Sequence, residues 1–180
     1  MTIEGHVARM GMLTQYGGPV TLDDADLALA DECARIRLAN AQRLRARDRW
    51  GQQSYQSDYL GACCEIAFAR WAGLGWACRE WAFKEGGDVN GFEVRKATLE
   101  YGMPVHLEGA HPDPVGRPCV AVIQRSPTEF TLPGWWVIGD EKPEWRRDPG
   151  GRRPAHFVPI SALRLMRTIP REFPQVLFGH

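Results

Sequence analysis

The chain has 180 residues, and its 22 Lys and Arg balance 22 Asp and Glu, so the formal net charge is zero. This length suits one domain with a substantial core and an extension, and the balanced charge does not by itself indicate a polyanion partner. No apolar run approaches the ~20 residues of a membrane-spanning helix. Five cysteines without a CxxC pair, and no secretory signal, predict free buried thiols in a reducing cytoplasm.

The N-terminal quarter predicts a lead-in followed by one long helix. Residues 1–20 show no hydrophobic period and are expected to be poorly ordered. Residues 21–51 begin with capping residues and acids, and apolar residues then recur at three- and four-residue steps. Six of the residues in 35–49 are Arg, so the helix has acids at its start and Arg at its end. This charge order suits the helix macrodipole, but the Arg cluster also suits a phosphate-binding face. Both interpretations stay open.

A second helix is predicted over 59–72, after a polar connector at 52–59 and before the helix-ending Gly73. One acid, Glu65, interrupts its apolar sequence. Glu65 lies about 100° round the helix from Cys64, which belongs to the predicted core face. It can therefore face the edge of a sheet. The alternative is an ordinary Glu paired with a surface Arg.

The segment 86–97 predicts a β-hairpin with two acids side by side. Asn90-Gly91 between apolar residues is a strong signal for a two-residue turn. That turn places Asp88 opposite Glu93, with Cβ atoms about 5 Å apart, where like charges repel unless a cation neutralises them. The alternative is a turn-stabilising Asp and an exposed strand Glu. Because side chains alternate, Arg95 shares the face of Glu93.

The remaining elements are shorter. Trp135 and Trp136 are expected on opposite faces of one strand. The core is predicted to span 52–166, with an extended tail over 167–180. Strands are predicted near 76–83, 105–107, 119–124, 135–138 and 156–158, and a helical turn at 159–165.

A basic segment follows the tryptophan pair. It lies in a predicted loop over 139–154 and combines Arg and Lys with one aromatic residue, which suits a clamp on a nucleic-acid backbone. An ordinary solvated loop is the alternative. The candidate nucleic-acid-binding residues are Lys142, Trp145, Arg146, Arg147, Arg152 and Arg153.

The order of these motifs resembles the PD-(D/E)xK nucleases, in particular small phage-encoded members. The similarity rests on Gly61-x-x-x-Glu65-x-Ala67 in a helix, then Asp88, then Glu93-x-Arg95 in a strand, and it covers roughly residues 55–165. It implies an α/β (α+β) fold with a restriction-endonuclease-like core, in which helices flank a central mixed sheet. It also implies hydrolysis of phosphodiester bonds, in DNA rather than RNA, with Mg²⁺ or Mn²⁺, in a phage or prophage context in the host cytoplasm.

The resemblance also implies roles for individual residues. Asp88, Glu93 and the Val94 carbonyl would bind the metal, and Glu65 would hold a metal-bound water or a second ion. Arg95 stands where the family pattern usually has Lys. Because Arg keeps its proton, it can neutralise phosphate but is a poor general base.

A local bulge could bring Lys96 to the site instead of Arg95. Three functions stay open: an active nuclease, a nuclease-fold protein without activity that binds nucleic acid or a host protein, and a purely structural α+β domain.

Overall fold

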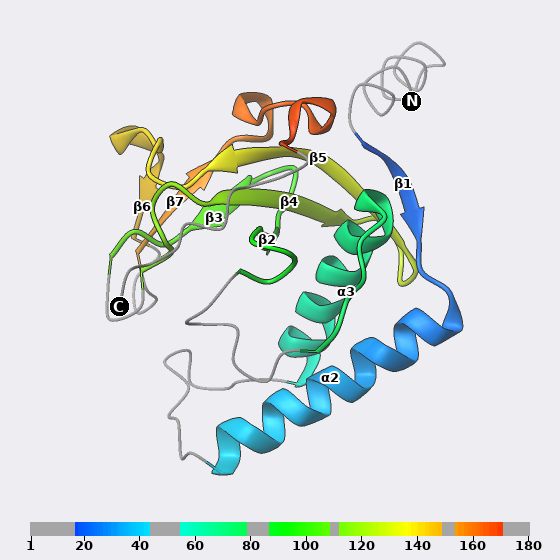
Figure 1. Ribbon diagram of the computed structural model, residues 1–180. Helices are drawn as coiled ribbons and strands as arrows, with labels where there is room; N and C mark the ends of the chain where they lie inside the picture. Colours follow the sequence, from blue (N-terminus) through cyan, green and yellow to red (C-terminus); the bar gives the residue numbers. More distant parts are fainter. Residues whose placement is uncertain (1–16, 44–54, 79–86, 109–111, 149–153, 171–180) are drawn as a thin grey trace.

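The computed structural model describes residues 17–43, 55–78, 87–108, 112–148 and 154–170 (Figure 1). Two helices are described, α2 (Asp24–Arg43) and α3 (Tyr55–Ala72). The strands are β1 (Gly17–Thr21), β2 (Glu93–Lys96), β3 (Met103–Val105), β4 (Pro118–Gln124), β5 (Glu129–Val137), β6 (Arg146–Arg147) and β7 (Ala155–Val158). Three single-turn 3₁₀ helices are η1 (Pro143–Trp145), η2 (Ile160–Ala162) and η3 (Met166–Thr168).

The strands form two sheets. The larger has the order β1-β5-β4-β2, in which β2 runs parallel to β4 and the other pairs are antiparallel. The smaller has the order β3-β7-β6 and is antiparallel. The fold therefore has the mixed α+β composition expected from the sequence.

The molecule has three layers, with α3 and α2 on one face of the larger sheet and the smaller sheet on the other (Figure 1). Strand β4 explains this arrangement because it is buried on both faces. Val120 and Val122 pack toward the helices, whereas Cys119, Ala121 and Ile123 pack toward the smaller sheet. Among the described residues the helices cover one face of the larger sheet, since β3 and β7 cover the second face.

Local hydrogen bonds fix the helix ends. At the start of α2, the Asp23 carboxylate accepts a bond from the Asp26 backbone N–H at 2.9 Å, which is an N-cap contact. Buried Asp26 also binds Arg70 of α3 at 2.6 Å, which joins the two helices. Helix α3 ends at Gly73, whose φ of +67° and the bond from Leu74 N–H to the Ala69 carbonyl form a Schellman motif.

Several predicted bounds differ from the observed ones. Residues 17–20 belong to β1, an edge strand on β5, and not to a lead-in. Helix α3 begins at Tyr55, four residues before the predicted start at 59. There the Tyr55 hydroxyl donates a hydrogen bond to Asp31 of α2. Trp76–Cys78 are not in a strand, and the strand predicted at 105–107 is displaced to Met103–Val105. The segment predicted as a loop over 139–154 contains η1 and β6, and the expected tail begins with η3.

The predictions for two strands and for the tryptophan pair are confirmed. The strand over 119–124 is β4, and the last predicted strand is β7. Trp135 is buried against the helix-side core, whereas Trp136 is half-buried against the second core. No helix in the described ranges is long and apolar enough to cross a membrane. The predictions for residues 1–16, 44–54, 79–86, 149–153 and 171–180 lie outside the described residues.

The prediction of five free thiols is wrong for two cysteines. Cys33 of α2 and Cys78, which follows α3, form a disulfide across 45 positions of the chain. The other three, Cys63, Cys64 and Cys119, are free and buried. Burial raises the pKa of the Cys64 thiol to about 12, so it is an unreactive core residue.

Candidate functional site

The predicted hairpin turn is present and places Asp88 beside β2. Asn90 has a φ of +45° and Gly91 a φ of +89°, as a turn of this kind requires. Val89 and Phe92 pair across the turn, and both are buried. The paired ladder ends there, because β2 then pairs with β4 and not with the segment before the turn. Asp88 is therefore not in a strand.

Gly87 is the residue that lets the chain enter this turn. Its φ is +73°, and a Cβ at this position would lie 2.8 Å from the Phe92 carbonyl oxygen. We expect Gly87→Ala to lower the free energy of unfolding by about 2 kcal/mol, because both the backbone and the neighbouring carbonyl would be strained. Chemical denaturation measures this. Gly75→Ala is the matched control, since nothing lies within 4 Å of its Cβ position, and equal losses in the two variants would contradict the prediction.

Arg95 lies at the centre of the site. Its Nη1 donates to Asp88 Oδ2 and to the Val94 carbonyl, each at 3.1 Å. Its Nη2 donates to Glu93 Oε2 at 2.9 Å and to Asp113 Oδ1 at 3.0 Å. The three oxygen donors predicted as metal ligands thus all bind one guanidinium group. Arg95 was expected to face phosphate, but here it pairs with the acids.

Two residues that the sequence did not single out complete the cluster. Arg117 Nη1 donates to Glu93 Oε1 at 2.6 Å. Asp113 is buried, and its other oxygen accepts a bond from the His106 backbone N–H at 2.8 Å. Three carboxylates therefore face two guanidinium groups, which leaves one net negative charge in a mostly buried cluster.

Burial controls the protonation of this cluster. It raises the pKa of Asp88 and of Glu93 above their ordinary values, and Arg95 opposes this rise in both. Burial alone would lower the pKa of Arg95, but the surrounding acids reverse that effect and the pKa is raised. Arg95 therefore stays charged and opposes the protonation of both acids. It cannot serve as a general base.

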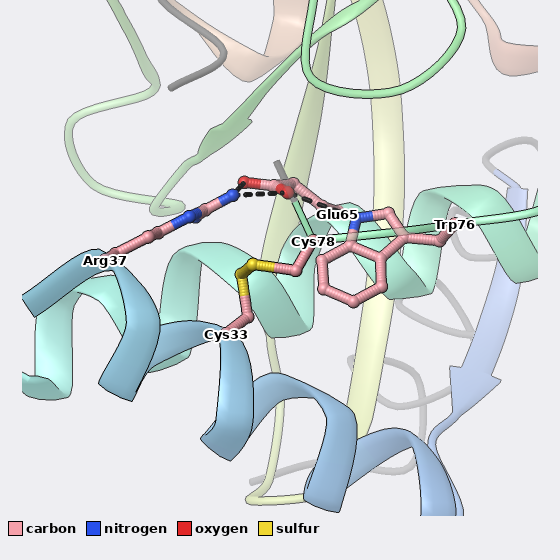
Figure 2. The surroundings of a disulfide bond; sticks show 5 residues. All are labelled: Cys33, Arg37, Glu65, Trp76 and Cys78. Carbon is pink, nitrogen blue, oxygen red and sulfur yellow. Dashed lines mark hydrogen bonds and ion pairs between the residues drawn. A yellow bond between two sulfur atoms is a disulfide. The ribbon is translucent and has the colours of Figure 1, made fainter. Parts of the chain in front are cut away.

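Glu65, on α3, lies near enough to Asp88 to contribute to the rise of its pKa, although burial is the larger cause. It is buried and accepts bonds from Arg37 Nη2 of α2 at 3.0 and 2.9 Å, and from Trp76 Nε1 at 3.1 Å. The alternative of a Glu paired with Arg is thus correct about the partner, although the pair is mostly buried and not at the surface. The Cys33–Cys78 disulfide lies next to this pair, one turn of α2 from Arg37 (Figure 2).

A cavity of about 280 Å³ lies beside Asp88. Its walls come from two segments, 75–77 after α3 and 88–90 in the hairpin. Trp76 therefore both holds Glu65 and lines the space next to Asp88. The disulfide at Cys78 fixes the end of the first wall to α2.

The donor atoms at this site decide whether a metal ion fits it. In the described part of the chain, no group of three or more His, Cys, Asp or Glu side chains is arranged to hold a metal. The carboxylates and the Val94 carbonyl are nevertheless hard oxygen donors that already converge on a cation, the Arg95 guanidinium. Mg²⁺ and Mn²⁺ prefer oxygen donors of this kind, and in this structure Arg95 occupies them.

The basic segment is only partly available. Arg146 pairs with Glu108 at 2.9 Å, and Trp145 packs edge-on against Trp136 with ring centroids 5.4 Å apart. Lys142 lies over the Trp145 ring, and Arg147 is exposed. Arg152 and Arg153 lie outside the described residues. Lys96 is exposed and points away from Arg95, so no bulge brings it to the acids.

The fold and this cluster define an α+β protein with a buried acid–arginine site at the edge strand β2. Comparison with protein-family models, curated proteins and solved structures finds no match.

Proposed function

We propose that the protein is a metal-dependent phosphodiesterase that cleaves nucleic acid, with DNA as the expected substrate, at the cluster around Asp88 and Glu93. The supporting observation is that one Asp, one Glu and the Val94 carbonyl converge on a single cationic group. A restriction-endonuclease-like core, a phage or prophage context and a place in the host cytoplasm belong to the same proposal.

The chemistry assigns a part to each of these residues. Asp88, Glu93 and the Val94 carbonyl would hold Mg²⁺ or Mn²⁺, which supplies an activated water and charge relief at the phosphate when bound. Glu65 is already held by Arg37 and Trp76, so we assign it a positioning role.

Arg95 has to leave the acids before an ion can take the same oxygens. A phosphate group offers its guanidinium a bidentate acceptor of equal charge-assisted strength. Substrate phosphate would therefore draw Arg95 away from Asp88 and Glu93, and Arg95 would then neutralise phosphate charge. This exchange makes Arg95 compatible with hydrolysis without asking it to lose a proton.

A second candidate is a nuclease-fold protein that binds nucleic acid or a host protein without cleaving. One observation favours it, because Arg95 and Arg117 already give Asp88, Glu93 and Asp113 hydrogen-bonded partners. A cluster satisfied in this way is stable without a metal.

Cleavage assays distinguish the two candidates. Single- and double-stranded DNA and RNA are incubated with Mg²⁺, Mn²⁺ or chelator. We expect metal-dependent cleavage, reduced at least tenfold by Asp88→Asn and by Glu93→Gln, since each removes a charged ligand and keeps the side-chain shape. Glu129→Gln is the matched control, because Glu129 is an exposed acid at the start of β5, away from the cluster.

The outcomes separate clearly. Cleavage lost in both site variants and kept in Glu129→Gln supports the phosphodiesterase. Binding of nucleic acid without cleavage, by a folded wild-type protein with metal present, supports the second candidate. Neither cleavage nor binding would leave the structural α+β domain as the better description.

A further inference from the structure

A second and larger cavity, of about 500 Å³, lies at the far end of the larger sheet from Glu93. Its walls come from the turn after β2, the adjoining ends of β4 and β5, and the segments around η1, β6 and β7. Ile123, in its floor, is two residues beyond Ala121, the β4 partner of Arg95, and packs on the same face. The cavity and the acid cluster thus share one face of the sheet.

Three aromatic side chains line this pocket. Tyr101 is 49 % exposed, an unusual position for a large ring, and Phe157 and Trp145 are half-buried. Trp145 is held in place by Trp136 behind it. Flat, fixed rings of this kind stack well on a planar heterocycle, and each such stack is worth about 1–3 kcal/mol for a nucleobase.

Two arginines at the pocket lack carboxylate partners within the described part of the chain. Arg125 and Arg147 are both exposed and line the cavity. By contrast, Arg95, Arg117 and Arg146 all form ion pairs. Arg147 lies near enough to Tyr101 to lower the pKa of its hydroxyl, although hydrogen bonding to Glu100 outweighs this effect.

The pocket also contains acceptors that suit a base. Glu144 lines it as an exposed carboxylate, and Glu100 bonds to the Tyr101 hydroxyl. Carboxylates accept hydrogen bonds from the exocyclic amino groups of bases. Unpaired guanidinium groups, in turn, suit a phosphate. The cavity is apolar and has stacking rings, an acceptor and two arginines that form no ion pair among the described residues. It therefore matches a ligand with a planar base and an anionic group.

We propose that this pocket binds a nucleotide unit, with the base against Tyr101, Trp145 and Phe157 and the phosphate at Arg125 or Arg147. The ligand class rests on the nucleic-acid function proposed above, but the pocket shares no residue with the acid cluster. The unit can come from a free nucleotide or from a single strand. An acidic aromatic peptide is the competing occupant.

Isothermal titration in chelator tests this site without cleavage. The probes are a nucleoside monophosphate, the matching nucleoside, inorganic phosphate and a short oligothymidylate. We expect the monophosphate to bind at least tenfold more tightly than the nucleoside or phosphate. Arg147→Gln and Tyr101→Ala should each weaken binding at least fivefold, and their exposed positions make misfolding no concern. Arg35→Gln, an exposed arginine of α2, is the matched control.

Each result decides something. If both variants weaken the binding of the monophosphate and of the oligonucleotide, the site is supported. The probe that binds more tightly then shows whether the nucleotide unit comes from a free nucleotide or from a single strand. The proposed site is overturned if neither variant changes binding or if no binding occurs at millimolar nucleotide. It is also overturned if only an acidic aromatic peptide binds. A wild type that binds nucleotide in this pocket without cleaving DNA would refute the phosphodiesterase and keep the pocket.

Discussion

Replacing Arg95 by Gln should lower the free energy of unfolding by about 3 kcal/mol at neutral pH. Removing one partner of a buried pair typically costs about 3–5 kcal/mol. We take the low end because 25 % of the Arg95 side chain is exposed and Arg117 still holds Glu93. The loss arises because Asp88, Asp113 and Glu93 would stay buried without the cation that they share.

The loss should depend on pH in a direction that the pKa shifts define. Burial raises the folded-state pKa of Asp88 and Glu93, so between the ordinary carboxyl range and the raised pKa the folded state binds more protons than the unfolded state. Stability from these groups is therefore highest at acid pH and falls as pH rises through that window. Without Arg95 both pKa values should rise further, so Arg95→Gln should lose stability more steeply with pH than wild type.

The same variant should gain affinity for divalent ions. With Arg95 gone, Mn²⁺ can take the oxygens that the guanidinium held, and we expect binding at least tenfold tighter than in wild type, with partial recovery of stability. Titration calorimetry and thermal unfolding with and without Mn²⁺ measure both effects. Arg146→Gln removes an exposed ion pair and should change stability by less than about 1 kcal/mol. A stable Arg95→Gln protein with no pH dependence would show that Arg95 does not hold the acids.

Features with a local cause could be predicted from the sequence. The turn at Asn90-Gly91 depends on two adjacent residues that tolerate positive φ, and it is found where expected. The end of α3 at Gly73 has the same kind of cause. The alternation that places Trp135 and Trp136 on opposite faces depends only on the pleat of a strand.

The start of β5 was missed because Pro133 and Gly134 are usually turn residues. In the structure both lie inside the strand. Gly134 is needed there because a Cβ would lie 2.5 Å from the carbonyl oxygen of Arg164, whose segment bridges to Trp135. The contact with Arg164, 30 residues further along the chain, leaves no signal in the local sequence. Pro133-Gly134 therefore predicts the end of a strand and not its interior.

The sequence predicted which residues form the site, but it did not predict the contacts between them. Asp88, Glu93 and Arg95 are close in sequence, and their proximity followed from the turn. Asp113 is 18 positions from Arg95, and Arg37 is 28 from Glu65, so both contacts depend on how distant elements pack. Only tertiary structure shows that Arg95 neutralises the acids.

The Cys33–Cys78 disulfide should contribute about 4 kcal/mol to the free energy of unfolding. It connects residues 45 positions apart, and closing a loop of that length in the unfolded chain removes roughly this much free energy in the chain-entropy description. Reduction, or the double substitution Cys33→Ser and Cys78→Ser, should therefore lower stability by that amount. Denaturant unfolding with and without reductant measures the loss, and the doubly substituted protein, which reductant should not affect, is the control.

Thiol counting checks the bond itself. In denaturant without reductant, three thiols should react, from Cys63, Cys64 and Cys119, and after reduction all five should. Five reactive thiols before reduction would contradict the disulfide. The consequence extends to the candidate site, because the bond ties the wall of the Asp88 cavity to α2, the helix that also supplies Arg37 to Glu65. Reduction should therefore increase hydrogen exchange at 75–77 before the rest of the core unfolds.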